Sequence, residues 1–241
     1  SVKILHRDFI FLAVLILFGG VLMFSYGEHM DQESEQRILY SNIVAYGEQF
    51  GAEGGLYGRL AESGIIDIRD NIEKDHGMAV FYPVTWIYYV NQTSTYIGNL
   101  LWHGYIYLIC AGAVLCLYFW IKSLFDEPTA MITVLLYFLT PRMFAEMHYN
   151  NKDMIILSLV FYVMFLGWNL YQKTTLKEIL LFAAAGAFIS NMKIIGIFLW
   201  GLTGMAVVIC KIFSGKWNKQ LFWKIVACVL IAGALYYALT P

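Results

Sequence analysis

Residues 96–121, YIGNLLWHGYIYLICAGAVLCLYFWI, form an apolar run that contains no Asp, Glu, Lys or Arg. A helix rises about 1.5 Å per residue, so a run of this length covers a hydrocarbon core about 30 Å thick. The composition of the whole chain agrees, because 60% of its 241 residues are hydrophobic and only 14% are charged. A soluble domain has roughly 25% charged residues. The run therefore predicts a membrane-spanning helix.

Six further apolar runs predict an all-α membrane protein with about seven transmembrane helices. They cover residues 9–26, 128–141, 154–171, 179–189, 194–213 and 221–239. The runs at 128–141 and 179–189 are too short to cross a bilayer alone. We expect each to be extended by its polar flank, 142–146 or 190–193, or to join its neighbour as a broken helix in a protein-lined cavity.

The distribution of charge predicts the orientation of these spans. Placing the N-terminus in the cytoplasm puts nine Lys and Arg against four acids inside, and seven Lys and Arg against thirteen acids outside. This is the asymmetry that the positive-inside rule describes. The cytoplasmic cations are Lys3, Arg7, Lys122, Lys173, Lys177, Lys211, Lys216, Lys219 and Lys224. The net charge of -1 hides this segregation. A basic nucleic-acid-binding protein would not show such a pattern, so we do not expect nucleic acid as a partner.

A long extracytoplasmic loop follows the first span, over residues 27–95, and carries eleven of the outer acids. Its apolar residues recur at helical spacing between glycines, which predicts short juxtamembrane helices. Its most apolar part, MAVFYPVTWIYYV at 78–90, is too short to span. Tyrosine and tryptophan favour the headgroup region, so we expect this segment to lie along the membrane surface.

A polar stretch directly after the first span is the first candidate site. It contains His29, Asp31 and Glu33. Asp31 and Glu33 have the chemistry of a general base and its partner, or of oxygen ligands that bind a divalent cation together with His29. The alternative is an acidic linker that only keeps the loop solvated.

The linker between the third and fourth predicted spans is a second candidate, with sequence TPRMFAEMHYNNKD over residues 140–153. Charge close to the bilayer is costly unless it is paired or faces water, so such a cluster indicates function. Arg142 and Lys152 have the chemistry to hold a phosphate. Asp153 begins the fourth span, where the helix dipole favours a carboxylate.

A structural interpretation of this linker is helix capping plus an Arg142–Glu146 pair one helical turn apart. It leaves His148 and Lys152 unexplained.

Lys193, in the polar flank of the fifth span, is a third candidate. It either contacts a lipid phosphate from within the bundle or extends its amino group to the membrane surface. The four cysteines lie inside apolar runs without paired spacing and are interpreted as packing residues.

This arrangement resembles the membrane module of the GT-C superfamily of polyprenyl-phosphate-dependent glycosyltransferases. Within it, the chain is similar to the family 39 group related to protein mannosyltransferases and aminoarabinose transferases. Besides the architecture, the resemblance rests on HMDQE at 29–33, KDHG at 74–77 and LTPRMFAEMHYNNKD at 139–153. The last is similar to a PR-F-…-N-KD signature of bacterial members. The first departs from the adjacent Asp-Glu pair of the family, since Gln32 separates the two acids.

The resemblance covers nearly all of residues 1–241 as one transmembrane module. It implies further C-terminal helices, and often a soluble domain, that this chain lacks. The implied reaction is an inverting transfer of a hexosyl or pentosyl group from a polyprenyl-phosphate donor, at the extracytoplasmic face of a bacterial plasma membrane. The acceptor is a protein, lipid or glycan. Some branches use a divalent cation and others do not, so metal dependence stays open.

The resemblance also implies roles for individual residues. Asp31 would be the base, Glu33 its neighbour and Asp153 the second acidic site. The lipid phosphate would contact Arg142, Lys152 and Lys193. His29, Glu146 and His148 remain further site candidates from the two polar stretches. The competing function is a transporter, or a non-catalytic lipid-binding or assembly subunit. The long acidic outer loop favours the enzyme, because carriers seldom need one.

Overall fold

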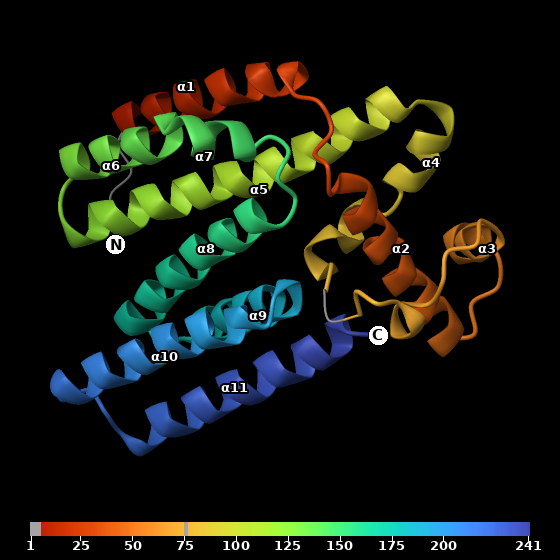
Figure 1. Cartoon of the computed structure of the whole chain (residues 1–241). Coiled ribbons are helices and arrows are strands. Elements are labelled where there is room, and N and C mark those ends of the chain that lie inside the picture. The colour runs from red at the N-terminus through yellow and green to blue at the C-terminus, as the bar shows by residue number, and fades with distance from the viewer. Residues whose placement is uncertain (1–5, 75–76) are drawn as a thin grey trace. The chain divides into compact units, whose positions relative to one another are not determined.

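A computed structural model describes residues 6–74 and 77–241, and every regular element in these residues is a helix (Figure 1). Lys3 of the predicted cytoplasmic group, and Asp75 and His76 of the KDHG motif, lie outside the described residues. The chain divides into two compact units. The first contains the N-terminal segment up to His29 together with Ile87–Phe165, and the second contains Met30–Trp86 with Leu166–Pro241.

Five helices of the described chain are long and apolar enough to cross a membrane, which is consistent with an integral membrane protein. They are α1 with the 3-10 turn η1 (His6–Leu22 and Met23–Ser25), α5 (Thr95–Leu124), α8 (Asp153–Gln172), α10 (Ile195–Phe213) and α11 (Lys219–Leu239). Each coincides with a predicted apolar run to within a few residues. The two short runs are also helices, α6 (Glu127–Leu139) and α9 (Leu176–Met192), but they do not reach the length of a span.

The first unit is built around α5, which has α1 and α6 packed beside it (Figure 1). The hydroxyl of Ser94 accepts a hydrogen bond from the backbone N–H of Ile97 and so caps the start of α5. Asp126 caps α6 in the same way by accepting from the backbone N–H of Thr129 at 2.9 Å. These hydrogen bonds from Thr129 lower the pKa of the Asp126 carboxyl.

Pro141 explains why α6 is short. Proline lacks a backbone N–H and disfavours helical geometry in the residue before it. Thr140 accordingly has an extended backbone (φ -62°, ψ 119°), and a separate short helix, α7 (Pro141–Glu146), follows. The run therefore ends at Leu139, and its polar flank 142–146 belongs to the separate helix α7.

A buried ionic cluster joins α1 to α5 at the predicted cytoplasmic end of the first unit. Asp8 is fully buried, and its carboxylate accepts hydrogen bonds from Lys122 at 2.6 and 2.8 Å and from the Tyr118 hydroxyl at 2.6 Å. Arg7 pairs with Glu127 at 2.5 Å, and Glu127 also lies 3.5 Å from Lys122. Two of the cytoplasmic cations therefore have acidic partners within the protein.

The second unit has a helical layer in which α9 packs against both α10 and α11 (Figure 1). Gly186 on α9 lets α10 approach closely, because a Cβ atom there would lie 2.5 Å from the Trp200 indole. The same indole N–H donates to the Phe182 carbonyl at 2.9 Å. The sequence predicted that the apolar run 179–189 continues into its polar flank, 190–193. This is confirmed for Ser190–Met192, which belong to α9. Lys193 lies outside the helix, with β-type backbone angles (φ -160°, ψ 135°).

The segment predicted to be a long loop contains helices. These are α2 (Gln32–Gln49), α3 (Gly55–Glu62), the 3-10 turns η2 (Ile68–Asp70) and η3 (Ala79–Val84), and α4 (Ile87–Thr93). The apolar stretch 78–90 is not one helix, since η3 and α4 are separate. Its residues Met78, Ala79 and Phe81 are at most 1% exposed, so this part is buried in protein where contact with lipid headgroups was expected.

Candidate functional site

The acidic motif lies at the N-terminus of α2, in the second unit. Asp31 and Glu33 are exposed, and Glu33 forms an ion pair with Arg37 at 2.7 Å. Glu35, by contrast, is only 4% exposed. It precedes Ile38 and Leu39 by three and four residues, which places it on the buried stripe of the helix. A buried acid therefore lies two residues after the motif, and the sequence interpretation missed it although its helical spacing was a usable signal.

The polar linker between α6 and α8 belongs to the first unit and forms a chain of hydrogen bonds. Arg142 contacts Glu146 at 2.7 Å, and the side-chain amide of Asn150 donates to the other oxygen of Glu146 at 3.2 Å. The Asn150 side-chain oxygen accepts from the backbone N–H groups of Lys152 and Asp153 at 3.2 and 2.9 Å, which caps α8. The predicted capping and ion pair are thus both present.

His148 is enclosed by the first unit. It is fully buried, its Nδ1 lies 2.6 Å from the Phe144 carbonyl, and its Nε2 lies 2.9 Å from the Gly19 carbonyl. The rings of Tyr26 and Tyr107 stack on it, with centroid distances of 4.6 and 5.0 Å. Both nitrogens and both faces are occupied by protein, which favours a packing role. His29 also stacks in this unit, on Tyr149 at 5.5 Å.

A cavity of about 630 Å³ lies in the second unit, where η2, the end of α9 and the end of α11 meet. Its polar lining comes from Asn42, Arg69, Lys74, Ser190, Asn191 and Thr240. Its apolar lining includes Ile68, Ile194 and Tyr236. A cavity of this size that combines cations, amides and hydroxyls with an apolar wall has the character of a ligand site.

Asn191 holds the walls of this cavity together. Its side-chain oxygen accepts from the backbone N–H of Ala79 at 2.9 Å, and its side-chain amide donates to the Leu239 carbonyl at 3.1 Å. Its own carbonyl accepts from the backbone N–H of Gly77 at 3.1 Å. A Cβ atom on Gly77 would lie 2.2 Å from that carbonyl oxygen, so only glycine fits. One side chain thereby connects η3, α9 and the end of α11.

Two tyrosines support the same wall. The Tyr46 hydroxyl donates to the Ala238 carbonyl at 2.7 Å. The Tyr82 hydroxyl lies 2.9 Å from the Leu239 carbonyl and 3.2 Å from the side-chain oxygen of Asn42. Burial raises the pKa of both hydroxyls. They stay protonated donors at neutral pH and attach α2 and η3 to the last turn of α11.

Arg69 and Lys74 differ in how their charges are compensated. Arg69 donates from Nε to both carboxylate oxygens of Asp67, at 2.8 and 2.9 Å, and from Nη2 to Glu48 at 2.9 Å. The Arg69 hydrogen bond is the main reason that the pKa of the Asp67 carboxyl is lowered. Lys74 has no ion pair among the residues that the structure describes. Of the two cations in the lining, it is therefore the one without a carboxylate partner in the described part of the chain.

The predicted site residues thus fall into two groups. Arg142, Glu146, His148, Lys152 and Asp153 lie together in the first unit, with His29 stacked on Tyr149. Asp31, Glu33 and Lys193 lie in the second unit. Lys193 is exposed and sits in the chain between Asn191 and Ile194, which both line the cavity.

Sequence interpretation did not select Arg69 or Asn191, and it noted Lys74 only as part of the KDHG motif. That motif was the one available signal for the cavity. Within the described part of the chain, no three His, Cys, Asp or Glu side chains are grouped so as to hold a metal ion. Comparison with known proteins gives no match to a family model, to a curated protein or to a solved structure.

Proposed function

We propose that this protein is a membrane glycosyltransferase of the GT-C type, which transfers a sugar from a polyprenyl-phosphate donor to an acceptor. The observation that carries the proposal is the cavity of about 630 Å³ with Arg69 and Lys74 in its lining, formed at the ends of apolar helices. A lipid-phosphate sugar needs such a combination, because its tail is apolar while its phosphate requires cations and its sugar requires hydrogen-bonding groups.

The proposed topology extends the five long helices to seven spans by including α6 and α9 with their polar flanks. The N-terminus is cytoplasmic and residues 27–95 are extracytoplasmic, in a bacterial plasma membrane. The support is the segregation of charge, with nine cations against four acids on one side and seven against thirteen on the other. The cavity then opens on the extracytoplasmic side, since Ile68, Arg69, Lys74 and Gly77 contribute part of its lining.

In the proposed reaction, the acceptor nucleophile attacks the anomeric carbon of the sugar while the bond from that carbon to the phosphate oxygen breaks. The phosphate departs with its lipid and with the electron pair of that bond. Lys74 stabilises the negative charge on the leaving phosphate. The hydroxyl of Ser190 belongs to the same lining and has the chemistry to hydrogen-bond the donor.

A carboxylate accepts the proton that the acceptor loses. Asp31 is our candidate for this base, with Glu33 and Asp153 as the other acids. The exposure of Asp31 at the start of α2 suits a group that must meet an incoming acceptor. Arg142, Lys152 and Lys193 are candidates for additional contacts with the lipid phosphate, and of these Lys193 lies nearest in sequence to the cavity lining.

The test uses the complete reading frame that contains these residues, reconstituted in nanodiscs with a panel of polyprenyl-phosphate sugars. We expect one donor to bind and to release polyprenyl phosphate when an acceptor extract is added. Lys74→Ala should weaken donor binding by about 10- to 150-fold, while Lys173→Ala, a matched removal of an exposed lysine elsewhere, should leave it unchanged. Binding without turnover under any acceptor condition would support the lipid-binding alternative, and failure to bind any donor would reject the proposal.

A further inference from the structure

A second basic hollow lies at the opposite end of α11 from the cavity described above. Its volume is about 170 Å³, and its lining includes Thr174, Lys211, Lys216, Asn218 and Lys224. All of these residues belong to the second unit. Three of the lining residues are lysines and none is acidic. The hollow therefore concentrates positive charge without a carboxylate to balance it.

Lys211 is the most informative of the three lysines, because it is only 6% exposed. Its ammonium lies 5.4 Å from the centroid of the Tyr171 ring, and Lys216 lies 5.9 Å from the same ring. Among the described residues, the ammonium of Lys211 makes no hydrogen bond and no ion pair. A buried ammonium is costly unless an anion compensates it, and a tyrosine face supplies only part of that compensation.

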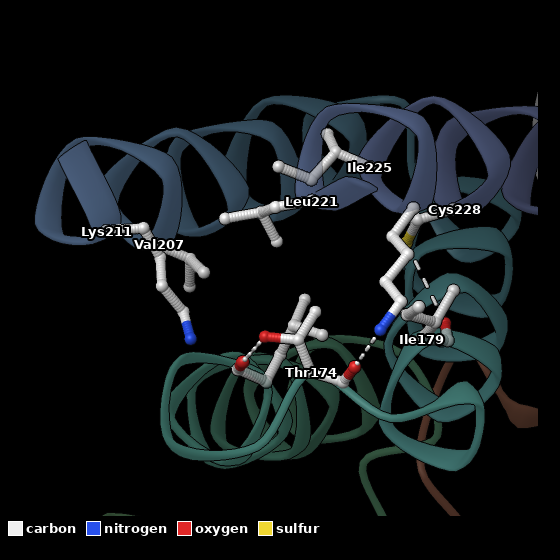
Figure 2. A pocket seen from close by; sticks show the side chains of 9 residues that line it. Thr174, Ile179, Val207, Lys211, Leu221, Ile225 and Cys228 are labelled. Carbon is white, nitrogen blue, oxygen red and sulfur yellow. Dashed lines mark hydrogen bonds between the residues drawn. The ribbon is translucent and has the colours of Figure 1, made fainter. Parts of the chain in front are cut away.

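Figure 2 shows the Lys211 side chain reaching from α10 toward the turn that carries Thr174. Lys224, on α11, donates a hydrogen bond to the Thr174 carbonyl at 2.8 Å, which fixes its amino group beside the same turn. Lys211 and Lys224 also line a separate, much smaller void of about 10 Å³, together with Val207, Leu221 and Ile225 (Figure 2). The lysines of the hollow therefore border apolar side chains.

The surroundings of the hollow place it at a membrane surface. It lies where α10 ends and α11 begins, and both helices are long and apolar enough to span. Trp217 and Trp223 flank this turn and are 40% and 56% exposed, and Phe213 is 87% exposed. Exposed tryptophans at the end of an apolar helix mark the level of the lipid headgroups. An anion that reaches this hollow is therefore next to the ends of lipid chains.

We propose that this hollow binds the phosphate of an anionic phospholipid headgroup, with phosphatidylglycerol as the type of ligand. Lys211, Lys216 and Lys224 supply the charge, and Asn218 and Thr174 supply polar lining. Basic pockets between transmembrane helices are a recognised form of anionic-lipid site. The lipid, and not a soluble phosphate, is the occupant, because exposed aromatic and apolar side chains surround the hollow.

The test is native mass spectrometry of the full chain in detergent after incubation with phosphatidylglycerol, phosphatidylcholine or diacylglycerol. We expect retained adducts of phosphatidylglycerol, few of phosphatidylcholine and none of diacylglycerol. Each lysine near a membrane surface contributes about five-fold to binding of anionic lipid, so Lys216→Gln should weaken retention by about that factor. Lys211→Met with Lys216→Gln should lower it by about 25-fold.

The matched control is Lys177→Gln with Lys219→Gln, which removes two exposed lysines outside the hollow and the same amount of charge. Retention in this variant should fall by less than two-fold. An equal loss in both double variants would show diffuse attraction and overturn the proposal. Full displacement of phosphatidylglycerol by millimolar glycerol 3-phosphate would also overturn it, because the site would then recognise a soluble phosphate. The single variant Lys216→Gln changes an exposed residue, so it remains informative if Lys211→Met does not fold.

Discussion

Lys122 on α5 places its ammonium 2.6 and 2.8 Å from the two carboxylate oxygens of Asp8 on α1, and Asp8 is fully buried. Removing one partner of such a pair leaves an uncompensated charge in an apolar environment. We expect Lys122→Met to destabilise the protein by about 3–5 kcal/mol, measured by thermal unfolding in detergent.

The double variant Lys122→Met with Asp8→Asn should recover much of that loss, because no buried charge remains. The matched control is Arg7→Gln, which breaks the neighbouring pair with Glu127. Arg7 is 68% exposed, so this change should cost only about 0–1 kcal/mol. Equal losses for Lys122→Met and Arg7→Gln would contradict the assignment of Asp8 and Lys122 as a buried pair.

Gly77→Ala should disrupt the wall of the large cavity. Its Cβ would lie 2.2 Å from the backbone carbonyl oxygen of Asn191, and a backbone atom cannot move aside cheaply. Gly58→Ala is the control, since a Cβ there meets nothing within 4 Å. We expect a lower unfolding temperature for Gly77→Ala alone, and equal temperatures for the two variants would refute the close approach of Gly77 and Asn191.

The pair of Asp67 and Arg69 predicts a dependence of stability on pH. Arg69 holds the pKa of the Asp67 carboxyl below its usual value of about 3.9, so the pair stabilises the fold above that pH. This stabilisation is lost as the pH falls through the lowered pKa of the folded protein. The difference in unfolding temperature between the parent and Arg69→Met should therefore be constant above about pH 5 and shrink at lower pH. Arg37→Met, which removes an exposed pair, should show little difference at any pH, and a difference for Arg69→Met that stays constant down to pH 2 would contradict the prediction.

The proposed reaction predicts different effects for acids and cations. Asp31→Asn should lower turnover by about 100-fold or more while the donor still binds, because a general base contributes about 10²–10⁴-fold. Lys74→Ala should instead weaken donor binding by about 10- to 150-fold, since a charge-assisted contact contributes about 1.5–3 kcal/mol.

Both quantities are measured on the reconstituted full reading frame, by product release and by equilibrium binding of donor. Near-normal turnover in Asp31→Asn would remove it as the base, and Glu33 and Asp153 would be tested next. Glu35→Gln is an informative companion because Glu35 is buried on the same helix. A large loss of turnover in Glu35→Gln with none in Asp31→Asn would assign the catalytic acid to Glu35, one helical turn further along α2.

The proposed topology predicts that residue 62 is accessible from outside the cell. Glu62, at the end of α3, is exposed, and Lys173, after α8, is exposed on the side proposed to be cytoplasmic. In a background that lacks Cys110, Cys116, Cys210 and Cys228, an impermeant maleimide should label Glu62→Cys in intact cells. It should label Lys173→Cys only after permeabilisation, and the reverse pattern would invert the topology.

The apolar helices were predictable because hydropathy is a property of local sequence. The run expected at 154–171 is α8, Asp153–Gln172, and the run expected at 194–213 is α10, Ile195–Phe213. The cap at Asp126 and the break at Pro141 are also local, since both depend on residues adjacent in the chain. Prediction was less complete for the apolar stretch 78–90, because whether an apolar residue contacts protein or lipid depends on distant segments.

The large cavity could not be predicted for the same reason. Asn191 contacts Ala79, which is 112 residues earlier in the chain, and Leu239, which is 48 residues later. No pattern of spacing encodes these partners. Lys193 was selected because its charge interrupts an apolar sequence, whereas Asn191, two residues earlier and uncharged, organises the cavity wall. Nothing in the local sequence distinguished Asn191, because it is uncharged and its partners are distant in the chain.

The break at Thr140 also bears on how this protein enters the bilayer during synthesis. At thirteen residues, α6 is about 20 Å long, shorter than the hydrocarbon thickness of a membrane, although the proposed topology includes it as a span. By itself, α6 is therefore a weak signal for transfer from the insertion machinery into the lipid. Only Phe125 and Asp126 separate it from α5, whose thirty residues form a strong signal. We expect α5 and α6 to leave the insertion machinery together as a helical hairpin, so that the order of insertion follows the pairing of helices in the finished fold.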